Sequence, residues 1–103
     1  MKWIVHDRFG HEIYMTEERW QHALDHDWMS EALIEKVLNT ITEGRRHQEA
    51  LSPNKYRYYH PFDDLPGDNN YVVVVVKFGF RLSEKDEIVP NNFVLTAYLV
   101  EEL

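Results

Sequence analysis

The chain has 103 residues, of which 44% are hydrophobic and 14% aromatic, and its formal net charge is −7. This size and apolar content predict a single domain with its own core, and the lack of cysteine excludes disulfide bonds, cysteine-based zinc sites and thiolate nucleophiles. The acidic total disfavours indiscriminate binding to duplex nucleic acid, because that affinity comes mainly from Lys and Arg contacts to phosphates.

The first part of the chain predicts a short β-hairpin followed by a helix. Two apolar segments flank a turn that contains Gly10, whose conformational freedom suits a hairpin turn. Thr16 is a favourable N-cap for a helix over about residues 16–27. Apolar residues of this helix recur at the spacing i, i+4, i+8, as Trp20, Leu24 and Trp28, and so form one apolar face.

A second helix is expected from Ser30 to a stop at Gly44, because an apolar stripe follows the helical period between them. Strong β-formers and turn residues then predict four strands, over about residues 45–50, 55–60, 71–78 and 92–100. A charged connection covers residues 79–90. The fold class is therefore α+β: a short N-terminal β-hairpin, two α-helices and a four-stranded antiparallel sheet, in one domain over residues 1–103.

Five consecutive valines, Val72 to Val76, give the third of these strands two apolar faces. A strand with one solvated face should alternate between apolar and polar residues, so both faces are expected to be covered. The helices would cover one face. The N-terminal hairpin, a second copy of the chain or a different protein would cover the other. In the last strand, simple alternation places Val94, Thr96, Tyr98 and Val100 together on the more polar face.

Arg19, His22 and His26 cluster on the polar face of the first predicted helix. Imidazole titrates close to neutral pH, so His22 or His26 is a candidate general base or acid. Two other interpretations remain open. The histidines form an ordinary solvated face, or they chelate a metal together with a third ligand that the spacing does not identify.

The segment from Arg45 to His60 carries four Lys and Arg residues and a single acidic residue, Glu49. Alternation places Arg45 and Arg46 on opposite faces and mixes cations with aromatic rings on both. Such a surface suits single-stranded RNA, since guanidinium groups bind phosphates and rings stack on unpaired bases. An exposed hairpin with cation–π and charge pairs would have the same composition. The candidate RNA-binding residues are Lys55, Arg57, Tyr58 and His60.

The chain resembles the BECR group of small bacterial and phage proteins, named after barnase, EndoU, colicin nucleases and RelE. The resemblance covers most of the chain after residue 12. It rests on five segments: Met15 to His22, Gly44 to Arg46, Tyr56 to Tyr59, the valine-rich strand and Phe93 to Tyr98.

This resemblance implies a nuclease-like fold and a metal-independent endoribonuclease without a cofactor, acting as the toxin of a toxin–antitoxin pair. Carried over by position, it implies a site of His22, Arg45 or Arg46, and Thr96 with Tyr98. The 2′-hydroxyl of RNA would attack the adjacent phosphorus, with His22 as base and His26 or Tyr98 as acid. An antitoxin or a second copy would cover the valine-rich sheet. The alternative is a non-catalytic protein- or RNA-binding module of the same fold.

The apolar runs predict neither export nor membrane insertion. The N-terminal run is too short for a signal peptide, and the longest run, Tyr71 to Val76, is too short to cross a bilayer. Together with the lack of cysteine, this leads us to expect a cytoplasmic protein with no membrane partner.

Overall fold

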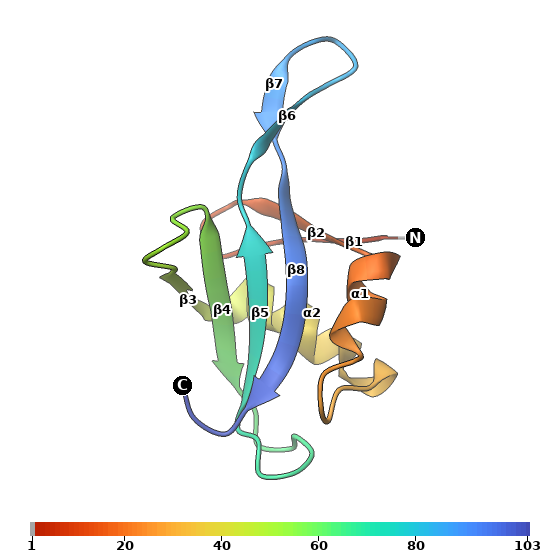
Figure 1. Ribbon diagram of the computed structural model, residues 1–103, viewed down its shortest axis with the longest axis vertical. Coiled ribbons are helices and arrows are strands. Elements are labelled where there is room, and N and C mark those ends of the chain that lie inside the picture. The colour runs from red at the N-terminus through yellow and green to blue at the C-terminus, as the bar shows by residue number, and fades with distance from the viewer. Residues whose placement is uncertain (1) are drawn as a thin grey trace.

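The computed structural model describes residues 2–103 and has one six-stranded sheet. In the view of Figure 1, one helix, α2, lies behind the sheet, and the other, α1, lies beside the last strand, β8. The strand order in this sheet is β1-β2-β8-β5-β4-β3. In chain order the elements are β1 (Lys2–His6), β2 (Glu12–Thr16), α1 (Glu17–Ala23), the 3₁₀ helix η1 (Glu31–Leu33), α2 (Ile34–Glu43), β3 (Arg45–Gln48), β4 (Lys55–Pro61), β5 (Tyr71–Lys77), β6 (Phe80–Leu82), β7 (Ile88–Pro90) and β8 (Asn92–Val100).

The predicted α+β fold is confirmed. Strands β3, β4, β5 and β8 form the four-stranded antiparallel sheet, each pairing with its neighbour in antiparallel register. The N-terminal hairpin, β1 with β2, joins this sheet through a short parallel pairing of β2 with the start of β8. The hairpin therefore extends the sheet at its β8 edge.

Helix α1 begins where the sequence predicts but ends earlier. The side chain of Thr16 accepts a hydrogen bond of 3.1 Å from the backbone N–H of Arg19, which confirms the N-cap. The regular helix ends at Ala23, and residues 24–28 form turns and a bend. The acidic Asp25 and Asp27 lie at this end, where the helix dipole disfavours negative charge.

Trp28 does not continue the apolar face of α1, so this prediction is wrong. Its backbone is left-handed, with φ of 70°, and its side chain is 60% exposed. Trp20, in contrast, is buried and donates a hydrogen bond of 2.8 Å from Nε1 to Glu31. Of the expected face, Trp20 is buried in the core and Leu24 packs against it, whereas Trp28 does not.

Helix α2 packs against the middle of the sheet and ends at Gly44, as predicted. A Cβ atom at Gly44 would collide with the backbone oxygen of Thr40 and lie 2.6 Å from that of Tyr59. The absence of a side chain thus permits the helix to end directly against β4.

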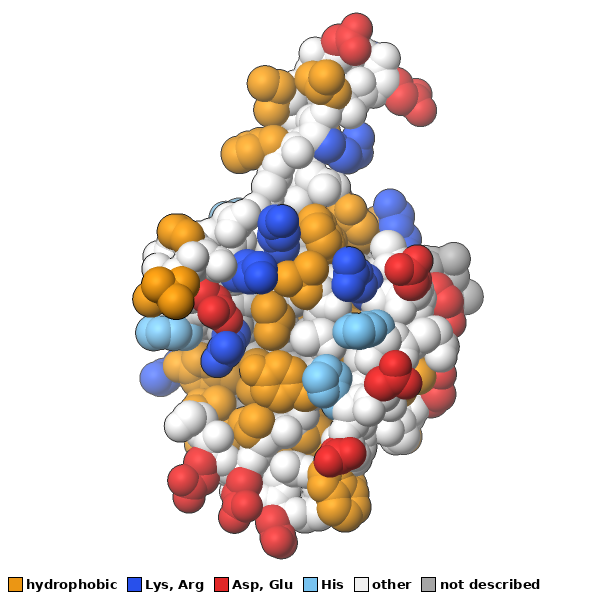
Figure 2. Space-filling model, in the orientation of Figure 1, with side chains coloured by type: hydrophobic (Ala, Val, Ile, Leu, Met, Phe, Trp, Pro, Cys, Tyr) orange, Lys and Arg blue, Asp and Glu red, His pale blue; other side chains and the backbone are white. Residues whose placement is uncertain are grey.

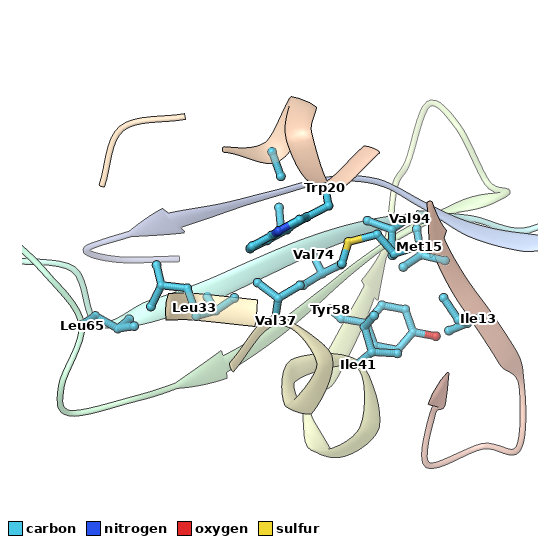
Figure 3. Packing of buried hydrophobic residues seen from close by; sticks show 14 residues of the cluster. Ile13, Met15, Trp20, Leu33, Val37, Ile41, Tyr58, Leu65, Val74 and Val94 are labelled. Atoms are coloured by element: carbon cyan, nitrogen blue, oxygen red, sulfur yellow. The ribbon is translucent and has the colours of Figure 1, made fainter. Parts of the chain in front are cut away.

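The core lies between the helices and one face of the sheet (Figure 3). Val72, Val74 and Val76 face the helices and are fully buried. They pack with side chains from both helices and the hairpin, including Ile13, Met15, Trp20, Val37 and Ile41, and with Tyr58 of the neighbouring strand β4. Burying one such aliphatic or aromatic side chain contributes about 1.5–3 kcal/mol, so this cluster is the main stabilising element of the fold.

The opposite face of the sheet is not covered by the N-terminal hairpin, one of the three covers the sequence left open. Trp3 of the hairpin contacts Trp20 edge-on at 6.3 Å between ring centroids, which places the hairpin on the helical side. On the open face, Val73 is only 4% exposed because its cross-strand neighbours are Tyr59 and Tyr98. Large neighbouring rings thus shelter this valine within the sheet itself.

The predicted alternation of β8 is wrong in its first half. Val75 pairs with Thr96 but Val76 pairs with Val94, so β8 contains one extra residue, Leu95, between them. Val94 is therefore buried in the core together with Ala97. The open face keeps Thr96 and Tyr98, as expected.

The charged connection predicted for residues 79–90 is a second hairpin, β6 with β7, which extends away from the body of the molecule (Figure 1). Phe80, Leu82 and Ile88 on one of its faces are all exposed. This segment makes no contribution to the buried core cluster.

Candidate active site

The open face of the sheet carries half of the ten site residues predicted from the sequence. It is turned toward the viewer in Figure 2, where Lys, Arg and His side chains surround an apolar floor. Strand alternation places the following residues on it: Arg45 and His47 of β3, Lys55, Arg57 and Tyr59 of β4, Val73, Val75 and Lys77 of β5, and Thr96 and Tyr98 of β8.

His26 lies against the β8 edge of this face. Its Nε2 atom is hydrogen-bonded to Oγ1 of Thr96 at 3.0 Å, and its ring lies 5.6 Å from the ring of Tyr98. His22 stands edge-on to His26, with 6.5 Å between the ring centroids. The structure thus brings together His22, His26, Thr96 and Tyr98, four of the six catalytic candidates.

The early end of α1 places His26 in this position. The turn after Ala23 is held by hydrogen bonds from Asp25 N to His22 O and from His26 N to Ala23 O. Helix α1 runs beside β8 (Figure 1), so the turn delivers the imidazole of His26 to the surface of that strand. Both imidazoles remain exposed and accessible to a ligand.

Two of the cations on the open face, Lys55 and Lys77, repel each other when no ligand is bound. Lys55 lies directly opposite Lys77 in the β4–β5 register, and like charges at such positions destabilise a sheet. Arg57 is two pairs further along the register and forms an ion pair of 2.7 Å with Glu49. A bound polyanion would relieve the repulsion between the two lysines.

Four of the eleven Lys and Arg residues, Arg45, Lys55, Arg57 and Lys77, share this face of an acidic chain, whereas Arg46 lies on the helical side. Figure 2 shows basic side chains over the upper part of the sheet and acidic side chains along its lower rim. Neighbouring strands lie about 4.8 Å apart, so Arg57 on β4 is separated from Thr96 on β8 by about 10 Å. That span corresponds to one or two nucleotides of an extended strand rather than to a single phosphate.

A shallow groove of about 350 Å³ crosses the same face. Its walls include His47, Arg57, Tyr59 and Tyr98, with Val73 at its floor. Two tyrosine rings, one guanidinium and one imidazole therefore line this depression, together with the acidic Glu102, and Tyr98 connects it to His26. Rings and a guanidinium are groups that bind single-stranded nucleic acid.

Arg46 is not part of this site, although it was a catalytic candidate. It pairs with Tyr58 on the helical side of the sheet, and its guanidinium lies 4.3 Å from the ring centroid of Phe9 and 4.4 Å from that of Tyr56. It also lies 3.8 Å from the carboxylate of Asp7. Arg46 thus holds the first turn of the chain against the core, whereas Arg45 points to the open face.

Tyr58 cannot contact RNA, because its side chain is fully buried. Its hydroxyl donates a hydrogen bond of 2.5 Å to Oδ2 of Asp7. Burial alone would raise the pKa of Asp7, but the hydrogen bonds from Tyr58, His11 and Phe9 outweigh it and lower that pKa. Burial and the same hydrogen bond raise the pKa of the Tyr58 hydroxyl well above its ordinary value.

His60 is also on the helical side, so the prediction that it belongs to the RNA-binding surface is wrong. Its ring packs against Phe62 at 4.8 Å, and its Nδ1 atom lies 2.8 Å from the backbone oxygen of Pro61. Lys55 and Arg57 are the predicted RNA-binding residues that do lie on the open face.

Lys77 and Trp28 lie at this site although neither was predicted there. Alternation from the buried Val76 would have placed Lys77 on the face of Thr96. Nothing local indicated that Trp28 leaves the core, because its spacing from Trp20 fits a helix.

Within residues 2–103, no three His, Asp or Glu side chains lie close enough together to hold a metal ion. In the same part of the chain, no helix is long and apolar enough to span a membrane. Comparisons of the chain with models of protein families, with curated proteins and with solved structures found no match.

Proposed function

We propose that this protein is an endoribonuclease that cleaves single-stranded RNA by attack of the 2′-hydroxyl on the adjacent phosphorus. The observation that carries the proposal is the imidazole pair, His22 and His26, held beside Thr96 near a groove lined by Tyr59, Tyr98 and Arg57. In-line displacement requires a base and an acid on opposite sides of the phosphorus, and the pair supplies both.

In the proposed reaction, His22 removes the proton of the 2′-hydroxyl as its oxygen bonds to phosphorus. The bond from phosphorus to the 5′ oxygen breaks, and His26 gives that oxygen a proton. The products are a 2′,3′-cyclic phosphate and a 5′-hydroxyl end. Neither proton transfer uses a metal ion.

The proposed reaction also needs a cation to stabilise the charge that develops on the phosphorane oxygens, and groups that position the histidines and the RNA strand. Thr96 orients His26 through the 3.0 Å hydrogen bond. Arg19 lies one helical turn before His22 on the same helix and is the cation assigned to the reacting phosphate. Arg57, Lys55 and Lys77 bind the neighbouring phosphates of the strand.

The experiment is to incubate the purified protein with total RNA in EDTA and to analyse the ends of the fragments. We expect cleavage with 2′,3′-cyclic phosphate ends, and a loss of about a hundredfold or more in the His22→Ala and His26→Ala variants. His6→Ala is the matched control, since His6 is exposed on β1 and its nearest charged partner is Glu12. Fragments with 3′-hydroxyl ends, or equal activity in all three variants, would refute the proposal.

A non-catalytic RNA-binding module is the second candidate function, and the opposed lysines Lys55 and Lys77 favour it. This pair attracts a polyanion whether or not the histidines move protons. The same experiment separates the two functions: a module binds RNA and leaves it intact.

We extend the first proposal to a toxin of a toxin–antitoxin pair, as the resemblance implies. Expression would then arrest growth, and His26→Ala would relieve the arrest. Arrest that persists in this variant would show that cleavage is not its cause.

A further inference from the structure

Trp28 presents an exposed indole beside the proposed catalytic pair. It lines a pocket of about 410 Å³ together with His26, Asp27, Tyr98 and Leu99. This volume falls within the range of about 300–1,000 Å³ that is typical of small-molecule sites. The pocket adjoins the shallow groove of the open face, because Tyr98 lines both.

The indole is fixed in place although most of it is exposed. A Cβ atom at Gly67 would lie 2.9 Å from Cε2 and 3.1 Å from Cζ2 of Trp28, so the ring rests against the bare backbone of the 63–70 loop. Trp28 and Gly67 both have positive φ, at 70° and 66°. A bulky residue rarely adopts this conformation, and its cost is about 1–3 kcal/mol.

This strained placement removes a large apolar ring from the core and aims it at solvent. No other described tryptophan behaves in this way: Trp20 is buried, and Trp3 packs against Trp20. A rigid, exposed indole next to a tyrosine is the usual platform for stacking an unpaired nucleobase.

Asp27 is the acidic residue among those that line the pocket. A carboxylate has two acceptor oxygens and no donor, so it pairs best with two adjacent N–H donors. Guanine presents two on its Watson–Crick edge. Adenine and cytosine present one amine beside an acceptor nitrogen, and uracil presents one N–H between two carbonyl oxygens. The negative charge of Asp27 also disfavours a phosphate in the pocket itself.

We infer that the pocket formed by Trp28, Asp27 and Tyr98 binds a guanine base, which stacks on the indole while its Watson–Crick edge pairs with Asp27. The inference rests on the proposed function, since it makes this pocket the specificity site for the nucleotide next to the scissile phosphate.

Binding is measured by the quenching of tryptophan fluorescence, which does not depend on cleavage. The ligands are GMP, AMP, CMP and UMP, and 2′-O-methyl tetranucleotides that contain one guanine or none. We expect GMP to bind about tenfold or more tightly than the other nucleotides. Tighter binding of the guanine tetranucleotide than of GMP identifies an RNA strand as the ligand, and equal binding identifies a free nucleotide.

Three variants complete the test. Trp28→Leu should abolish the quenching, and Asp27→Asn should remove the preference for guanine. Trp3→Phe is the control, and it should retain both the quenching and the guanine preference. Equal affinity for all four nucleotides in the wild type, or unchanged quenching in Trp28→Leu, would overturn the inference.

The two proposals are tested independently. Guanine binding without RNA cleavage would support the guanine pocket and refute the proposed nuclease activity. RNA cleavage by a protein that binds all four nucleotides equally would support the nuclease activity and refute the guanine pocket.

Discussion

The Nε2 atom of His26 lies 3.0 Å from Oγ1 of Thr96, which is 70 positions later in the chain. The helix that carries His22 ends at Ala23, so a turn rather than the helix sets the position of His26. The hydroxyl on β8 thus fixes the orientation of an otherwise exposed imidazole. This hydrogen bond joins the helical and the sheet part of the proposed active site.

Replacing Thr96 by Val tests this positioning role. Valine keeps the shape and the β-propensity of threonine but cannot hydrogen-bond His26. We expect cleavage of RNA to slow by about tenfold or more, with little change in the free energy of unfolding, because Thr96 lies on the open face. Thr96→Ser keeps the hydroxyl and should retain most of the activity. Equal rates for the Val and Ser variants would show that the hydrogen bond is not used.

The opposed lysines predict how RNA binding responds to salt. In a His26→Ala background that leaves RNA intact, Lys77→Gln should weaken binding to all sequences alike. The slope of log affinity against log salt concentration should fall by about 0.7, because one phosphate of the single strand is no longer neutralised. Lys85→Gln on the β6–β7 turn is the control. An unchanged slope in Lys77→Gln would exclude this lysine from the interface.

Much of the fold could be predicted because its signals are local. The valine-rich strand, the cap at Thr16 and the stop at Gly44 each follow from residue type and spacing. The end of α1 at Ala23 and the extra residue Leu95 in β8 could not, since both depend on which side chains fit against the finished sheet.

The candidate site was predictable in part for the same reason. Alternation correctly separates Arg45 from Arg46, but it does not reveal which side of the strand meets the helices. That side is decided by interactions across the fold, such as the hydrogen bond between Tyr58 and Asp7, 51 positions apart. The sequence therefore left Arg45 and Arg46 as alternatives, and it included Tyr58 and His60 among the RNA-binding residues although both lie on the helical side.

Tyr58→Phe should destabilise the fold. The variant keeps the buried ring but removes one hydrogen bond to the buried carboxylate of Asp7. The expected loss is about 1–3 kcal/mol in the free energy of unfolding, measured by urea denaturation. Tyr59→Phe on the open face is the matched control and should change the free energy little. Equal stability of both variants would contradict the structural role of the pair.

The same pair predicts how stability depends on pH. The pKa of Asp7 is lowered in the folded state, so its contribution is present above the unfolded value of about 3.9 and is lost as the pH falls through the folded pKa. The pKa of Tyr58 is raised, so its contribution is complete below about 10 and is lost as the pH rises above that value. The urea concentration at the midpoint of unfolding should therefore be lower at strongly acidic and at strongly alkaline pH than near neutral pH. Asp7→Asn should flatten the acidic decline, and Tyr58→Phe the alkaline one; parallel profiles for all three proteins would refute this assignment.

The most direct test of the proposed reaction uses two RNA oligonucleotides that contain a mapped cleavage site and differ only in the 2′ position of the nucleotide before it. We expect the all-ribose oligonucleotide to be cleaved, and the copy with a single 2′-deoxy substitution to be bound but to stay intact, because the attacking oxygen is missing. Cleavage of the deoxy copy at the same bond would contradict the proposed reaction, since water would then be the nucleophile.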